Sequence, residues 1–305
     1  FEFVVVDDCS TDSSKSILEE YAAKDNRVKV YSTPVNSWAH AAGNVGLENA
    51  KGKYIYILDS DDKLVKGALK TQVDFMEKHL NFDICGGWFQ CFEGHNKLMA
   101  SYETDNERIR MGMLYDSTLG HGGTLMRRDL IEKHKIRYNT EIYYTHDYHF
   151  FTQLAFDAHA RFTSLPTPVY FYRIHPGQTS TALNDKQKGF SDKVRLEVLA
   201  RLGIQEKALS KCHLCFCRKQ PQHIELPKQT IPAYFKAMVK SNQASGLFDE
   251  KLFSQYIAEK IAKNLPRMGY KAYGVLLSMP KEFFLNISGK QLSLLCFKAL
   301  RKPKK

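Results

Sequence analysis

The sequence lacks several patterns that would define its class at once. It has no uninterrupted run of about 18 apolar residues, so we expect no transmembrane helix. It contains no G-x-G-x-x-G and no G-x-x-x-x-G-K-S/T, so a dinucleotide-binding fold is unsupported and a P-loop is excluded. Its seven cysteines are scattered over 305 residues, which argues against a disulfide scaffold and fits a reducing cytoplasm. The remainder is ordinary for a globular protein, with 43% hydrophobic and 25% charged residues.

Positive charge is concentrated in the last third of the chain. From Ile204 to Lys305 there are 19 Lys and Arg against 6 Asp and Glu, whereas the preceding residues are near neutral. A basic tail indicates an anionic partner, membrane lipid or nucleic acid, and a solvated lysine-rich helical face is an equal alternative. The stretch from Leu292 to Lys305 is apolar and then strongly basic, which is typical of a helix lying on anionic lipid.

The basic tail gives two expectations about partners and location. The aromatic residues are not interleaved with the basic ones and there is no recognisable nucleic-acid motif, so we expect no nucleic-acid partner. We expect a cytoplasmic protein with peripheral contact on the inner face of the cell membrane. The chain begins with Phe1 in an apparent strand, so we expect no signal peptide.

The first 182 residues alternate between strand and helix patterns. The alternation predicts an α/β fold with a mostly parallel central sheet. The helix after the third strand would place Leu69, Val73 and Met76 on one apolar stripe. Strands are expected at 3–6, 28–31, 54–58, 84–92, 123–126 and 169–174, with helices at 13–23, 41–50 and 147–157. Residues 183–305 show helical patterning alone, at 188–202, 231–239, 248–264 and 291–299, so we predict one domain over 1–182 and a basic, mainly helical region over 183–305.

Acidic residues follow two of the predicted strands. Asp7 and Asp8 end the first strand, and Asp59, Asp61 and Asp62 crowd the end of the third. In parallel α/β sheets ligands bind beyond the carboxyl ends of the strands, and carboxylates this close repel one another unless a divalent cation offsets the repulsion. The alternative is a polar turn in which Asp59 or Asp62 caps a helix beginning near residue 64.

Five segments, in order, resemble family 2 glycosyltransferases. They are Val6–Asp12, similar to V-D-D-G-S-x-D with Cys9 in place of glycine; Asn44–Ile55, similar to R-N-x-G-x-x-x-A-x-G-x-Y-I; Leu58–Asp62, similar to L-D-x-D-D; Thr145–Phe151, similar to E-D-x-x-F; and Tyr172–His175 with Ser180, similar to Y-R-x-H…S. The resemblance covers about residues 1–181. It implies a GT-A (nucleotide-diphospho-sugar transferase) fold and transfer of a sugar from a nucleotide donor, usually a UDP-sugar.

The resemblance also implies a role for each matching residue. Asp8 would contact the uracil, and Asp59 and Asn44 would take part in donor binding. Asp61, with Asp59 beside it and His175 completing the site, would hold Mn²⁺ or Mg²⁺ against the diphosphate, because a nucleoside diphosphate leaves poorly unless its growing charge is neutralised.

Asp147 would be the catalytic base that takes the proton of the acceptor hydroxyl, and a single base with in-line attack inverts the anomeric configuration. Asp147 could instead be the N-cap of the following helix, and His175 a hydrogen-bonded histidine at a strand end.

The chain also departs from the family pattern. The family's first strand and helix, which contact the base, are absent, so we expect a fragment of a longer protein whose sheet has an unpaired edge. Gly43 stands where the family has an arginine that can contact the diphosphate, His146 replaces a glutamate beside the base, and Asn36-Ser37-Trp38 replaces Asn-x-Gly.

We therefore predict an inverting, metal-dependent glycosyltransferase that passes a sugar to a glycan or lipid-linked acceptor in surface polysaccharide synthesis. A catalytically inactive relative that binds a nucleotide-sugar or scaffolds a partner is the alternative. Cys212, His213, Cys215 and Cys217 include zinc-ligand residue types, but they lack a second C-x-x-C at a zinc-ribbon spacing.

Overall fold

The computed structural model describes residues 1–93, 98–99, 103–175, 177–178, 184–217, 229–264, 272–287, 289 and 293. The chain divides into two compact units, one made of residues 1–109 and 117–191 and the other of residues 110–116 and 192–305. The domain boundary predicted near residue 182 lies outside the described residues, as do most of the helix predicted at 291–299, most of the basic stretch from Leu292 to Lys305, and Ser180.

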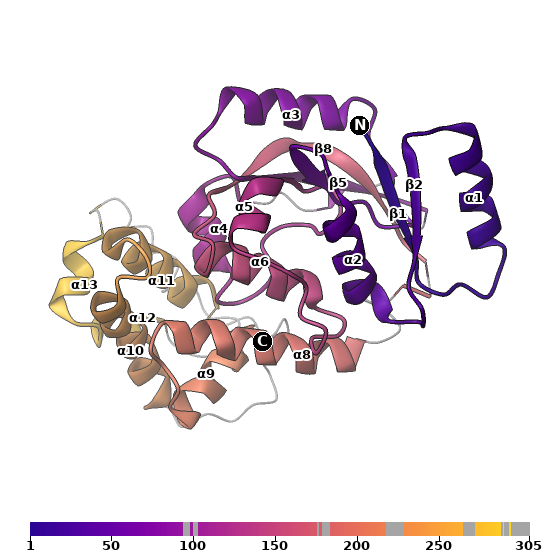
Figure 1. Ribbon diagram of the computed structural model, residues 1–305. Helices are drawn as coiled ribbons and strands as arrows, with labels where there is room; N and C mark the ends of the chain where they lie inside the picture. Colours follow the sequence, from indigo (N-terminus) through magenta and orange to yellow (C-terminus); the bar gives the residue numbers. More distant parts are fainter. Residues whose placement is uncertain are drawn as a thin grey trace. The chain divides into compact units, whose positions relative to one another are not determined.

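The first unit holds every described strand (Figure 1). Its strands are β1 (Phe3–Asp7), β2 (Val28–Ser32), β3 (Tyr54–Tyr56), β4 (Lys63–Leu64), β5 (Ile84–Phe92), β6 (Leu98–Met99), β7 (Leu125–Arg127) and β8 (Phe162–Arg173). Its helices are α1 (Ser14–Lys24), α2 (Trp38–Asn49), α3 (Ala68–Lys78), α5 (Arg128–Lys133) and α6 (His146–Phe156), and both α4 (Asn106–Gly112) and α8 (Asn184–Arg201) begin in it.

The strands form two separate sheets. β1 and β2 pair in parallel, while a six-stranded sheet has the order β3-β7-β5-β8-β4, with β6 on β5. In the described residues β1 pairs only with β2 and β3 only with β7, so the predicted unpaired edge is present.

The prediction of a mostly parallel central sheet is wrong in this respect. Within the larger sheet only β5 and β8 run parallel, and the other four pairs are antiparallel. A parallel pair needs a long crossover, which the chain between β5 and β8 supplies, whereas hydrophobic periodicity carries no information on strand direction.

Helix α3 covers one face of the larger sheet, and α2 and α6 lie on the other side (Figure 1). The residues of α3 that are buried are Ala68, Gln72 and Met76, rather than the predicted stripe of Leu69, Val73 and Met76. The Gln72 side chain is fully buried because its amide donates to the carbonyls of Cys85 and Gly123, each at 2.9 Å, so a polar residue holds the helix to the sheet.

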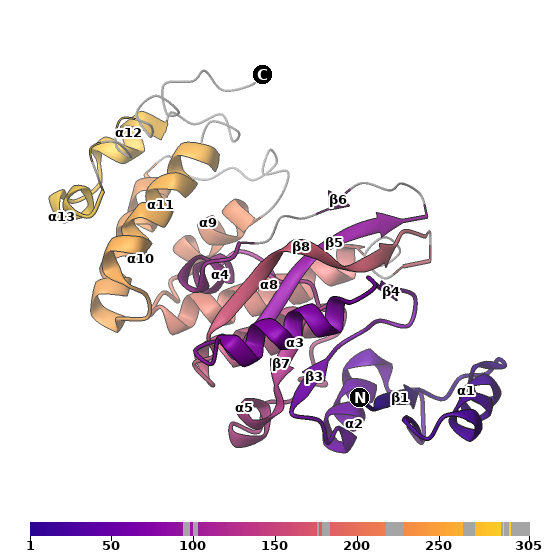
Figure 2. The same cartoon turned by 90° about the horizontal axis from the view of Figure 1, so that it is seen from above.

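The second unit is helical in its described residues (Figure 2). It contains the end of α8, then α9 (Lys207–Cys217), α10 (Thr230–Ser245), α11 (Glu250–Asn264), α12 (Ala272–Leu277) and α13 (Lys281–Leu285). Helix α9 was not predicted, because its Cys and His residues were considered only as zinc-ligand types. The structure buries Cys212, His213, Cys215 and Phe216 on one face of it. Among the described residues, no helix combines the length and apolar character needed to span a membrane.

The histidine of α9 is part of the core of the second unit. His213 is fully buried, with Nε2 2.7 Å from the Leu114 carbonyl oxygen and Nδ1 2.8 Å from the Tyr234 hydroxyl. Because both ring nitrogens are engaged in these bonds, His213 serves the packing of this unit. The described residues contain no group of three or more His, Cys, Asp or Glu side chains placed to hold a metal.

Candidate active site

Asp8 is held at the carboxyl end of β1. Its Oδ1 accepts hydrogen bonds from the Thr33 hydroxyl at 2.6 Å and from the backbone N–H of Ser37 at 2.9 Å. These bonds tie the end of β1 to the chain that leads from β2 into α2. Cys9 has φ 61°, in the left-handed region that disfavours side chains, which agrees with the glycine of the motif it resembles.

The loop after β3 joins the last strand of the sheet through Asp61 and Asp62. Asp61 Oδ2 lies 3.1 Å from His175 Nε2, and both side chains are partly exposed. Asp62 Oδ1 accepts the backbone N–H of Arg173 at 2.8 Å, and burial, aided by the charges of Asp61 and Asp59, raises the pKa of Asp62 to about 6. The alternative of a helix cap fails, because β4 follows this loop and α3 begins only at Ala68.

Asp59 contacts a histidine that the sequence did not single out as a site residue. Its Oδ1 lies 3.2 Å from Nδ1 of His121, and His121 Nε2 lies 2.9 Å from the hydroxyl of Tyr138. Burial by itself would raise the pKa of Asp59, but the charge and the hydrogen bond of His121 lower it overall, so this carboxylate is ionised at neutral pH. A Cβ on Gly122 would lie 3.3 Å from Asp59 Oδ2, so glycine keeps that side of the carboxylate open.

Asp147 lies in the first turn of α6, in the same unit as Asp59 and His121. Thr145 occupies the N-cap position of this helix, so the alternative role of Asp147 as the cap is not observed. Burial opposes protonation of His121, yet the charge of Asp59 and then that of Asp147 raise the pKa of His121 above its usual value. Two carboxylates from distant parts of the chain therefore act on one imidazole.

His146, the neighbour of Asp147, is a buried histidine. Burial lowers the pKa of His146 to about 4, and its Nδ1 has no hydrogen-bond partner among the described residues. Its ring lies against those of His121 and Tyr138, at centroid distances of 5.5 and 5.6 Å. The substitution of the family's glutamate thus places a neutral ring beside the proposed base.

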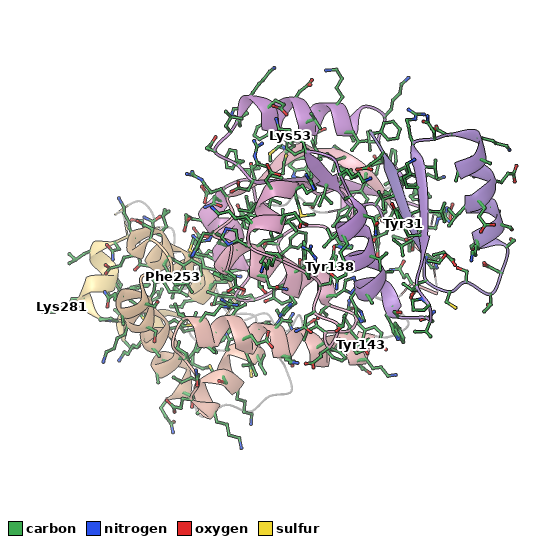
Figure 3. All side chains as sticks on the ribbon, in the orientation of Figure 1. Tyr31, Lys53, Tyr138, Tyr143, Phe253 and Lys281 are labelled. Atoms are coloured by element: carbon green, nitrogen blue, oxygen red, sulfur yellow. The ribbon has the colours of Figure 1, made fainter. Side chains whose placement is uncertain are left out.

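Asn44 is engaged with the protein itself. Its Nδ2 donates to the Tyr138 carbonyl at 2.9 Å, and its Oδ1 accepts the Tyr138 N–H at 2.8 Å. Figure 3 labels Tyr138 and Tyr143 on the segment between α5 and α6. The expected role of Asn44 in donor binding stays a prediction, whereas its contact with the backbone of this segment is observed.

The structure links several of the predicted residues and adds two to them. Asp59 bonds to His121, whose pKa the charge of Asp147 also raises, and Asp61 lies against His175. His121 and Tyr138 were missed as site residues. The one signal in the sequence is the glycines that flank His121, at positions 120, 122 and 123. Mg²⁺ is usually held by one or two carboxylates together with water and substrate phosphates, and Asp61 could supply one of them. The described residues contain no group of three metal-ligand side chains, so the cation site expected at Asp61, Asp59 and His175 stays a prediction.

Known proteins resemble this chain in sequence. The model of the family described as glycosyl transferase family 2 matches residues 1–135. A protein of Haemophilus influenzae named as an uncharacterized glycosyltransferase is 26% identical over 227 residues, covering 70% of each chain. TuaG of Bacillus subtilis, named as a teichuronic acid biosynthesis glycosyltransferase, is 44% identical over 87 residues, and this match spans 28% of the present chain and 34% of TuaG.

Solved structures show the same fold. The crystal structure of residues 1–349 of TarS from S. aureus, in complex with UDP-GlcNAc, superposes with a TM-score of 0.56 and 23% sequence identity, covering 85% of this chain and 79% of that one. The family model and the relatives identify residues 1–135 as a family 2 glycosyltransferase domain, and the chain has the GT-A fold of the solved glycosyltransferases.

Proposed function

We propose that the enzyme transfers a sugar from a UDP-linked donor to a glycan or lipid-linked acceptor in the synthesis of a cell-surface polysaccharide, with inversion at the anomeric carbon. The observation that carries the proposal is the pair of contacts made by the acidic loop after β3, where Asp59 bonds to His121 and Asp61 to His175, with the charge of Asp147 also acting on His121. The name of TuaG, which refers to teichuronic acid, and the UDP-GlcNAc complex of TarS support this choice of acceptor and donor.

Donor binding would use the acidic loop after β3. Asp61 and His175 would hold Mn²⁺ or Mg²⁺ between them, and Asp59 would take the ribose or the cation's water. The cation supplies charge neutralisation for the departing diphosphate. Asp8, fixed by Thr33 and Ser37, would present its remaining oxygen to the uracil.

Proton transfer would use Asp147. Its carboxylate lies in the first turn of α6, at the positive end of the helix dipole. It would take the proton of the acceptor hydroxyl while that oxygen attacks the anomeric carbon, and no second nucleophile is needed for an inverting reaction.

We further propose that the enzyme works at the inner face of the cell membrane through its basic last third. The excess of lysine and arginine there supports contact with anionic lipid. Sedimentation of the full chain with vesicles containing phosphatidylglycerol, compared with phosphatidylcholine vesicles, tests this; equal recovery with both would contradict it.

The function is tested by hydrolysis and transfer assays with UDP-sugars and Mn²⁺. Asp61→Ala should lose most activity through weaker donor and metal binding, and addition of a chelator should do the same to the parent. Asp74→Asn, which removes an exposed carboxylate on α3 that pairs with Lys70, is the matched control and should behave as the parent. UDP binding without turnover in the parent would instead select the inactive nucleotide-sugar-binding relative.

A further inference from the structure

The ring of Tyr138 occupies space that is available only because residue 43 is glycine. A Cβ built on Gly43 would lie 2.8 Å from Cε2 and 2.9 Å from Cδ2 of Tyr138, closer than such atoms pack. On its other side the ring stacks on Phe150, with centroids 4.3 Å apart. The Tyr138 ring is therefore confined between Gly43 of α2 and Phe150 of α6, and a larger residue at position 43 would displace it.

The backbone of Tyr138 is held as firmly as its ring. Both polar atoms of the Asn44 amide bond to its N–H and its carbonyl, so adjacent residues of α2 fix its main chain and leave room for its ring. The side chain is 5% exposed, and its hydroxyl is thereby aimed at His121.

Two hydrogen bonds hold the ring of His121. The ionised Asp59 carboxylate can only accept, so Nδ1 of His121 donates to it. Nε2 lies 2.9 Å from the Tyr138 hydroxyl, which can donate to a neutral ring or accept from a charged one, so the bond orients the ring in either state. Tyr138 thus fixes the ring orientation of His121, and His121 fixes the position of Asp59 Oδ1.

We propose that His121 and Tyr138 are positioning residues that orient Asp59 for the nucleotide-sugar donor, and that Gly43 supplies the space that lets them do so. This inference rests on the proposed function and deepens it. The glycine that departs from the family's arginine is here part of a unit with Tyr138 and Asn44. Mutation of residues that orient metal-ligating groups typically lowers affinity or activity by about 10- to 100-fold.

A matched pair of glycine substitutions in α2 tests the space requirement. Gly43→Ala forces the Tyr138 ring to move, whereas the Cβ of Gly46→Ala would meet only Cγ2 of Val6, at an ordinary 3.8 Å. Alanine favours a helix over glycine at both positions. We expect the dissociation constant for UDP with Mn²⁺ to rise about tenfold or more in Gly43→Ala and to stay within twofold of the parent in Gly46→Ala. Equal affinities in the two variants would overturn the proposal.

Substitutions of Tyr138 and His121 separate a role in positioning Asp59 from a role in folding. Tyr138→Phe removes only the hydroxyl, and His121→Asn keeps an amide donor near the place of Nδ1 while losing Nε2. Both should raise the donor KM and the UDP dissociation constant by about tenfold, with His121→Ala worse than His121→Asn, and with the thermal midpoint of Tyr138→Phe close to that of the parent. A fall in kcat alone, or donor affinity unchanged in Tyr138→Phe, would contradict positioning of the donor carboxylate.

A readout without donor separates this inference from the proposed function. Long-range ¹H–¹⁵N NMR of the histidine rings, with His121 assigned by its loss in His121→Asn, should show a proton on Nδ1 in the parent and shifted His121 ring signals in Tyr138→Phe and Gly43→Ala but not in Gly46→Ala. An Nδ1 without a proton in the parent, or His121 signals unchanged in Gly43→Ala, would overturn the proposal. Failure of the parent to bind or cleave any UDP-sugar would instead refute the proposed function and leave the NMR result standing.

Discussion

Nε2 of His175 lies 3.1 Å from Oδ2 of Asp61 across 114 positions of sequence, and this contact joins the end of β8 to the acidic loop after β3. If the pair holds one cation, then once either side chain is removed, removing the other should weaken donor binding little further.

A double-mutant cycle with Asp61→Asn and His175→Ala tests this coupling on the affinity for UDP with Mn²⁺. Each single change should weaken binding by about 10- to 100-fold, and the double variant should lose clearly less than both losses combined, because residues at one site are not additive. His79→Ala, at an exposed histidine at the end of α3, is the control. Strictly additive losses would mean that the two side chains act separately.

The buried amide of Gln72 makes a prediction about stability. Gln72→Met retains the shape but removes both buried hydrogen bonds to the carbonyls of Cys85 and Gly123, which should cost about 1–3 kcal/mol in the free energy of unfolding. Gln72→Glu should cost more, because a carboxyl would then face those two carbonyls. Urea unfolding of both variants, beside the exposed change Thr71→Ala, measures this; a neutral Gln72→Met would contradict the account.

Buried histidines predict a loss of stability in acid. Burial lowers the pKa of His213 to about 3 and that of His146 to about 4, and also lowers that of His40. Below the unfolded value of about 6.5 the unfolded chain takes up protons that the folded chain does not, so folding weakens as the pH falls from 6.5 toward 3–4, by up to about 1.4 kcal/mol per pH unit for each such group.

The contribution of His213 to this pH dependence of stability can be isolated with His213→Gln. This variant should be less stable than the parent at pH 7, because the core is disturbed, yet its stability should fall less steeply between pH 6 and pH 4. The slopes from urea unfolding at several pH values measure the difference. Parallel slopes would show that His213 takes up no proton on unfolding.

Much of the fold could be predicted from the sequence, where local pattern and structure agree. β5 has the predicted bounds, and α1 and α6 are each one residue from theirs. Strand direction was not predictable, because pairing depends on how distant segments meet. The buried face of α3 was shifted because Gln72 looks like a surface residue, and only the two carbonyls opposite explain its burial.

The candidate site, too, was predictable from the sequence only in part. Asp8, Asp59, Asp61, Asp147 and His175 stand out in motifs. The structure places Asp147 in the first turn of α6 and the other four in the segments that follow β1, β3 and β8. The link from Tyr138 through His121 to Asp59 could not be derived, because it depends on the bare backbone of Gly43 and on side chains from three separate segments.

The most direct test of the whole account is a comparison of turnover and binding in Asp147→Asn, which keeps the shape of the side chain and removes the base. With a UDP-sugar that the parent turns over, the account predicts that kcat falls by about 10²- to 10⁴-fold while the dissociation constant for UDP with Mn²⁺ stays within twofold of the parent. Turnover close to that of the parent, or a loss of UDP binding that matches the loss of turnover, would contradict the assignment of Asp147 as the group that takes the acceptor's proton.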